Sequence, residues 1–166
     1  RKLERGMSTL EVKAIQAPSG YDLQMPAGHI LQVVNGSTTT QVEGAYSSET
    51  DLGLSVSITP KFSSSKILVL VQAAGCGNRG TSTWWKMTLK RDSTALINFA
   101  AYVGINVSSQ ESYPNTTYLD SPNSTSAISY NCTGTRVSGS DNCYFNHTAS
   151  SPNSATSTIT AIEIAG

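Results

Sequence analysis

The sequence predicts an all-β protein: an antiparallel β-sandwich or jelly roll of roughly eight to ten short strands, preceded by a short N-terminal extension. Apolar residues alternate with polar ones in many short segments, and clusters of Gly, Pro, Asn and Ser separate these segments. An apolar period of about 3.6 residues persists nowhere for more than a few turns, so we expect no long helix.

In the first half of the chain, strand-like patterns cover residues 8–17, 29–34, 38–42 and 52–58. The Asn35-Gly36 pair predicts a hairpin turn between the second and third of these. From Leu52 to Ile58 every second residue is apolar, which predicts one face in the core and one in solvent. Pro60 ends this strand.

Residues 67–71 form an unbroken apolar run, Ile-Leu-Val-Leu-Val. Such a run predicts a strand that is covered on both faces. Either the strand is central in the sandwich with material on both sides, or a neighbouring subunit buries one of its faces. We therefore place Ile67, Val69 and Val71 among the candidate residues of a subunit interface.

The second half begins with a predicted hairpin, in which residues 84–90 and 95–102 are the strands and Arg91-Asp92-Ser93 is the turn. Residues 104–126 are polar and rich in Ser, Asn and Tyr, and we expect them to form long surface loops. Residues 127–137 and 143–149 are expected to pair as another hairpin, and residues 158–164 to form the last strand.

Two regions are predicted from these patterns. Residues 1–24 form an N-terminal anchoring or linking segment, with Leu3, Leu10 and Val12 as candidate anchor residues. Residues 25–166 form a single β-sandwich domain, because 166 residues suffice for one domain with a core.

Composition excludes several classes of function. Ser and Thr supply more than a quarter of the residues, only 13% are charged, and the formal net charge is zero. No basic stripe is present, so we expect no nucleic-acid binding. No apolar run approaches the ~20 residues of a membrane-spanning helix, so we expect no membrane partner. The uncharged polar surface favours a protein that works outside cells or on a particle.

The sequence contains no recognisable catalytic constellation, and we expect no enzyme, no metal and no cofactor. It lacks a nucleophile elbow of the Gly-x-Ser-x-Gly type and a calcium-binding Asp loop. His29 is interpreted as a strand-end histidine or a subunit contact, rather than as a metal ligand.

Three cysteines, Cys76, Cys132 and Cys143, occur without a CxxC pair. Cys132 and Cys143 flank a turn-like segment, and a disulfide across that turn is geometrically permitted. The alternative is that all three are reduced, half-buried thiols.

Aromatic residues are candidates for contact with other molecules. Neighbouring side chains in a strand point to opposite faces, so one of Trp84 and Trp85 must leave the core. We assign Trp85 and His29 to the candidate subunit interface. The candidate glycan contacts are Trp84, Tyr113, Asn115, Tyr118 and Asn123, because aromatic rings stack on sugars and polar tips donate hydrogen bonds.

Several segments together resemble a known family. They are MPAGHILQVV at 25–34, DLGLSVSITP at 51–60, SSSKILV at 63–69, LKRDST at 89–94, YLDSPN at 118–123 and STITAIEI at 157–164. In this order they resemble small virion-associated structural or tail-fibre-like proteins of marine and freshwater bacteriophages, of the cyanophage type. The resemblance implies a homotrimer within a virion, assembled in the host cytoplasm and released with the particle. Cys132, Cys143 and the tryptophan pair fall outside it.

Three functions are compatible with these observations. The first is a trimeric fibre or appendage module, which binds other virion proteins such as a fibre shaft, the tail or the capsid, and presents loops to host-surface glycans. The second is a capsid decoration protein that stabilises the head. The third is a free carbohydrate-binding, lectin-like module.

Overall fold

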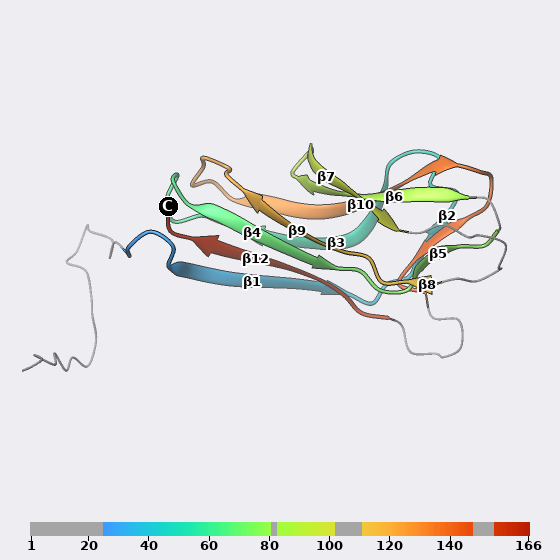
Figure 1. Cartoon of the computed structure of the whole chain (residues 1–166), viewed down its shortest axis with the longest axis horizontal. Helices are drawn as coiled ribbons and strands as arrows, with labels where there is room; N and C mark the ends of the chain where they lie inside the picture. Colours follow the sequence, from blue (N-terminus) through green and yellow to red (C-terminus); the bar gives the residue numbers. More distant parts are fainter. Residues whose placement is uncertain (1–24, 81–82, 102–110, 148–154) are drawn as a thin grey trace, which may run out of the picture.

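The computed structural model describes residues 25–80, 83–101, 111–147 and 155–166. These residues contain twelve β-strands and no helix, so the predicted all-β class and antiparallel pairing are confirmed. Figure 1 shows the elongated body that they form. The strands are β1 Ile30–Thr38, β2 Val42–Gly44, β3 Thr50–Ile58, β4 Lys66–Gln72, β5 Cys76–Asn78, β6 Trp84–Arg91, β7 Thr94–Ala101, β8 Glu111–Ser112, β9 Asn115–Asp120, β10 Ile128–Ser138, β11 Cys143–Phe145 and β12 Ser157–Ile164.

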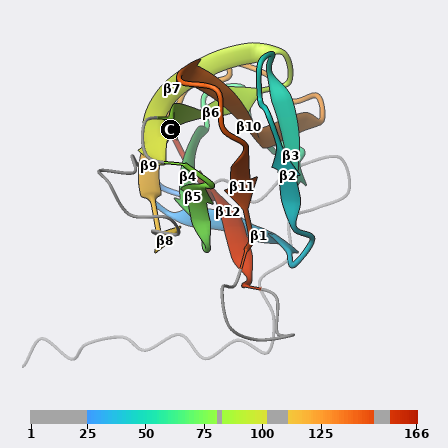
Figure 2. The same cartoon turned by 90° about the vertical axis from the view of Figure 1, so that its right-hand side faces the viewer.

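Two four-stranded sheets pack face to face. The first sheet has the strand order β1-β12-β4-β9 and the second has β3-β10-β6-β7, with every pair antiparallel. A third, shorter sheet, β2-β11-β5-β8, repeats the order of the first, because each of its strands lies next in the chain to a strand of the first sheet. The third sheet forms one end of the body, here called the distal end, which faces the viewer in Figure 2.

The core lies between the two large sheets and follows the alternation in the sequence. Leu52, Leu54, Val56 and Ile58 of β3 are buried, while the residues between them are exposed, as predicted. Inward side chains of the other sheet, including Ile159 and Ala161 of β12, complete the same cluster. Each fully buried Leu or Ile contributes roughly 1.5 to 3 kcal/mol, so this alternation is what holds the sheets together.

The hairpin turn predicted at Asn35-Gly36 is wrong, because β1 continues straight through both residues. A β-carbon added to Gly36 would lie 2.0 Å from the carbonyl oxygen of Ser55 on β3. The glycine is therefore needed for the close approach of two strands and not for a turn.

Two further predictions about the second half are corrected. Residues 115–120, placed in a surface loop, form β9 and pair with β4 along the edge of the first sheet. Residues 128–138 and 143–145 do not pair with each other: β10 lies in the second sheet, and β11 lies in the third. The β6–β7 hairpin is confirmed, and Asp92 in its turn has a φ of 52°.

The two ends of the described chain meet at the end of the body opposite the distal end. The amide of Gly28 donates to the carbonyl of Ala165 (2.7 Å), and the amide of Ala165 donates to the carbonyl of His29 (2.8 Å). We call this the terminal end (Figure 1). The predicted segment 1–24, with Leu3, Leu10 and Val12, lies outside the described residues.

Candidate functional site

The outer face of the first sheet carries the main unpartnered surface of the described chain. Its residues align in rows that cross the strands, because the register places partners side by side. Four of them, here called the apolar row, are Val33 on β1, Ile162 on β12, Leu68 on β4 and Leu119 on β9. Ile30 and Ile164 form the next pair towards the terminal end.

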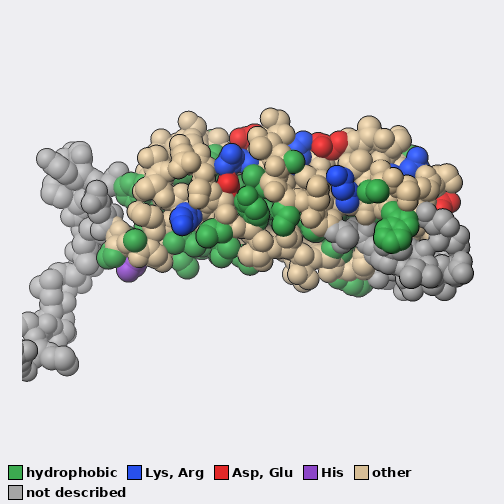
Figure 3. Space-filling view, turned by 45° about the horizontal axis from the view of Figure 1, so that its top comes forward, with side chains coloured by type: hydrophobic (Ala, Val, Ile, Leu, Met, Phe, Trp, Pro, Cys, Tyr) green, Lys and Arg blue, Asp and Glu red, His purple; other side chains and the backbone are tan. Residues whose placement is uncertain are grey.

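The apolar row is open to solvent at both edges of the sheet. Val33 is 59% exposed and Leu119 is 51% exposed, whereas Ile162 and Leu68 between them are half-buried. Figure 3 shows hydrophobic side chains gathered along the lower edge of the body, towards the terminal end. A contiguous apolar patch of this kind marks an interaction surface in soluble proteins.

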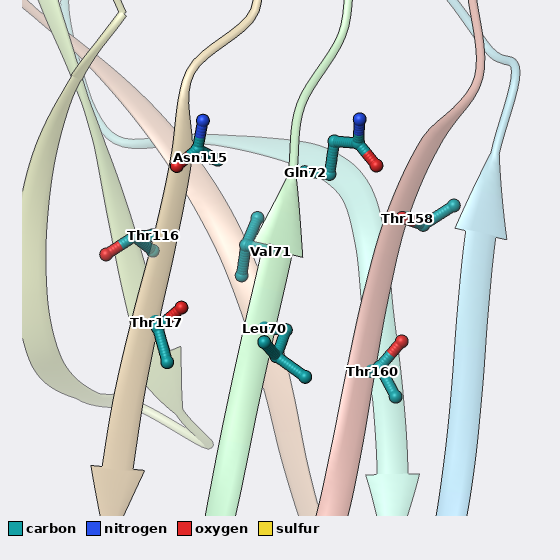
Figure 4. A pocket seen from close by; sticks show the side chains of 8 residues that line it. All are labelled: Leu70, Val71, Gln72, Asn115, Thr116, Thr117, Thr158 and Thr160. Atoms are coloured by element: carbon teal, nitrogen blue, oxygen red, sulfur yellow. The ribbon is translucent and has the colours of Figure 1, made fainter.

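Towards the distal end the same face becomes polar. Two rows, Thr160-Leu70-Thr117 and Thr158-Gln72-Asn115, line a shallow groove of about 370 Å³, here called the polar groove. Figure 4 shows these side chains along β9, β4 and β12. None of its lining residues in the described part of the chain is Lys, Arg, Asp, Glu or His.

The predicted interface residues on β4 and β6 are corrected. Ile67, Val69 and Val71 point into the sandwich of a single chain and are fully buried there, so no neighbouring subunit can reach them. Trp85 is also buried, at 2% exposure, with its ring 5.2 Å from that of Tyr46 in an edge-on arrangement. Leu68 and Leu70, the other half of the same apolar run, lie on the outer face instead, and they were not among the predicted interface residues.

His29, the remaining predicted interface residue, is exposed at the terminal end. Its Nδ1 lies 3.0 Å from the carbonyl oxygen of Pro26, within hydrogen-bond distance. His29 directly precedes β1 and is accessible to a neighbouring molecule.

The five predicted glycan contacts do not form one patch. Tyr113 and Asn115 lie together at the distal end of β9, and both are exposed. Asn123 follows the other end of β9, towards the terminal end, and Tyr118 is half-buried against the core. Trp84 is 52% exposed but stands on β6 of the second sheet. Only Asn115 lines the polar groove.

A buried carboxylate supports the sheet directly beneath the apolar row. Glu163 on β12 accepts hydrogen bonds from the Gln32 side chain (2.5 Å) and the Lys61 amide (2.7 Å). Burial alone would raise the pKa of Glu163, but these hydrogen bonds to the charged form outweigh it and lower the pKa. Glu163 thus stays ionised and fixes the loop after β3 to the first sheet.

Another carboxylate joins the two large sheets. Asp120, at the end of β9, accepts hydrogen bonds from Arg91 Nη1 at both oxygens (3.0 and 2.9 Å) and from the Tyr130 hydroxyl (2.7 Å). Burial and the hydrogen bond to Asp120 raise the pKa of Tyr130, so its proton stays in place. This network is structural, because every group in it has a partner.

The distal end is fixed by an ion pair across the third sheet. Arg79 donates to both oxygens of Glu43 (3.0 and 2.8 Å), and its guanidinium carbon lies 5.2 Å from the centre of the Tyr144 ring. The hydrogen bond from Arg79 lowers the pKa of Glu43. Tyr144 in turn packs on His147, with 4.6 Å between ring centres.

The disulfide considered for Cys132 and Cys143 is absent. These two residues and Cys76 are buried free thiols, and Cys132 and Cys143 belong to different sheets. Burial raises the pKa of each thiol to about 12, which leaves all three protonated at neutral pH.

The described residues hold no cluster of three or more His, Cys, Asp or Glu side chains that could bind a metal ion. Nor does any helix there have the length and apolar character needed to cross a membrane. Comparison with known protein families and with curated proteins gave no match for the chain.

Proposed function

We propose that the chain is a non-enzymatic structural module of a bacteriophage particle. In this proposal three copies assemble through the apolar row into a fibre or appendage head. The terminal end of this head is attached to the rest of the particle, and its distal end faces the host surface.

The observation that carries the proposal is the apolar row. Its four side chains cross the whole first sheet without a charged residue, and the two at the sheet edges are more than half exposed. A lone subunit would leave this surface in water, at a cost of roughly 25 cal/mol for each Å². Identical copies around a rotation axis would cover it.

The difference between the two ends of the body supports a role in attachment. The start of the sandwich and the last strand are hydrogen-bonded to each other at the terminal end, while Tyr113 and Asn115 lie exposed at the other end. Cyclic symmetry about an axis that runs along the body would keep all terminal ends on one side and all distal ends on the other. Such an assembly joins a shaft or shell on one side and leaves the opposite side free for the host.

The topology supports a jelly roll as the finer description of the fold. When β1 with β2, β4 with β5, β8 with β9 and β11 with β12 are each counted as one long strand, eight strands remain. They form two four-stranded sheets, and most connections cross from one sheet to the other, as in a jelly roll. This fold occurs in viral capsid and lectin domains.

Immunoelectron microscopy tests the proposal. An antibody against the purified protein should label intact particles of the phage that encodes the chain, at the tail or at an appendage. Uniform label over the head would favour the decoration protein instead. Particles without label, with the protein present only in the soluble lysate, would reject a role in the virion and favour a free lectin.

A further inference from the structure

The polar groove presents several side chains whose hydrogen-bonding groups are free. Within the described residues, the side chains of Gln72, Asn115, Thr117 and Thr158 make no hydrogen bond to the protein. Thr160 Oγ1 accepts a hydrogen bond from Asn35 Nδ2 (2.8 Å) and still has its own proton to donate. Hydroxyl and amide groups can both donate and accept, which matches the capacity of a sugar hydroxyl.

The groove combines these groups with an apolar floor. Leu70 lies between Thr160 and Thr117 in the middle of one row, and its side chain is partly exposed. An apolar floor can contact the C–H face of a sugar ring, while the flanking hydroxyls and amides bind the groups at its rim.

The spacing of the rows favours an extended ligand. Neighbouring strands lie about 4.8 Å apart, and residues on the same face of a strand are about 6.7 Å apart, so the two rows form a regular grid of polar groups. The groove is open along the sheet and lies on strands, not on loops (Figure 4). A chain of linked rings can satisfy several grid positions at once.

The composition of the groove favours an uncharged ligand. Among the described residues that line the groove, none is cationic and could neutralise a phosphate or a carboxylate, and none is acidic and could hold a metal ion or an amine. We propose that the polar groove binds an uncharged oligosaccharide, with Gln72 and Asn115 as the main hydrogen-bonding residues and Leu70 beneath the ring.

This inference deepens the attachment role proposed above and rests on it for its biological meaning. It moves the sugar contacts from scattered loop residues to the first sheet, beside the apolar row. Binding of a sugar at one site, through a few hydrogen bonds in open solvent, should be weak, with a Kd of about 1 mM. Three such sites on one particle-bound trimer would strengthen the binding by avidity.

An NMR titration of the ¹⁵N-labelled full chain tests the site. The probes are maltotetraose, chitotetraose, mannotetraose and galactotetraose, with tetragalacturonic acid as the charged comparison. At least one neutral probe should shift the side-chain amide signals of Gln72 and Asn115. The double variant Gln72→Ala/Asn115→Ala should weaken that binding about tenfold or more, while Ser55→Ala/Ser57→Ala, on the outward face of β3, should not change it.

Three results would overturn the inference: no shift at Gln72 or Asn115 with any neutral probe, equal binding by the Gln72→Ala/Asn115→Ala variant, or stronger binding of the acidic probe. A variant of the apolar row, Val33→Lys/Leu119→Lys, separates this site from the assembly. If it binds the neutral probe as the wild type does, the groove is independent of trimer formation. Failure of the sugar titration leaves the mass of the assembly, measured separately, unaffected.

Discussion

Gly36 on β1 passes directly over the carbonyl oxygen of Ser55 on β3, so closely that a single β-carbon would lie 2.0 Å from that oxygen. The contact joins the edge strand of the first sheet to the edge strand of the second. It sets how closely the two sheets can approach each other along this side. Because the obstacle is backbone, no side-chain rotation can relieve it.

Gly36→Ala should therefore destabilise the protein by at least about 2 kcal/mol, since β1 and β3 must move apart to admit the methyl group. Urea unfolding followed by circular dichroism measures this change. Gly44→Ala is the matched control: Gly44 is also a strand glycine, but its added β-carbon would meet only Tyr46 at 3.9 Å, an ordinary contact. Equal stability of the two variants would show that the sheets are not in close contact at Gly36.

The same glycine shows what could be predicted from the sequence. Strict alternation in β3 predicted its inward face correctly, because burial of every second residue is a local signal. The alternation in β6 did not tell which of Trp84 and Trp85 faces the core, and Trp85, assigned to an interface, is the buried one. Asn35-Gly36 carried an equally strong local signal for a turn. It failed because Gly36 is required by a strand distant in sequence, and such a contact leaves no mark in the neighbouring residues.

The candidate site was harder to predict, for the same reason. Tyr118 and Leu119 were surrounded by Ser, Thr, Asn and Pro, which gave the segment the composition of a loop, yet it pairs with β4. The unbroken apolar run of β4 indicated that both faces of the strand are covered, but it did not indicate which face meets the core. The apolar row and the polar groove exist only once the register of four strands is known.

Asp120→Asn should lower the free energy of unfolding by about 2 to 3 kcal/mol, because it removes the charge that balances Arg91 at a buried junction between the sheets. Chemical denaturation at neutral pH gives the value. For comparison, Glu49→Gln breaks the exposed ion pair with Lys90 and should cost no more than about 1 kcal/mol. An Asp120→Asn variant as stable as Glu49→Gln would contradict the proposed joining role.

Acid should destabilise the protein through Glu163. Its pKa in the folded state lies below the ordinary value of 4.5, so its stabilising contribution is present above pH 4.5 and is lost as the pH falls through the lower, folded value. Glu163→Gln should be less stable at neutral pH and should lose part of this acid dependence. Unfolding curves at a series of pH values from about 7 down to about 3 test this. Parallel pH profiles for the two proteins would show that Glu163 does not contribute.

The three cysteines should not react in the folded protein. With pKa values raised to about 12 and no solvent exposure, Cys76, Cys132 and Cys143 are neither ionised nor accessible. Labelling with a thiol-specific chromogenic disulfide should detect none of them in the native state and all three in denaturant. Fewer than three thiols in denaturant without reductant would reveal a disulfide instead.

Sedimentation of the purified protein tests the central claim, that identical copies cover the apolar row. We expect a single species of three times 17.5 kDa at micromolar concentration. Val33→Lys/Leu119→Lys should convert it to a folded monomer, because two charges would then face the partner subunits. Val137→Lys, at a residue that is 65% exposed on β10 of the second sheet, should remain trimeric. A stable wild-type monomer at these concentrations, with the apolar row in water, would contradict the account.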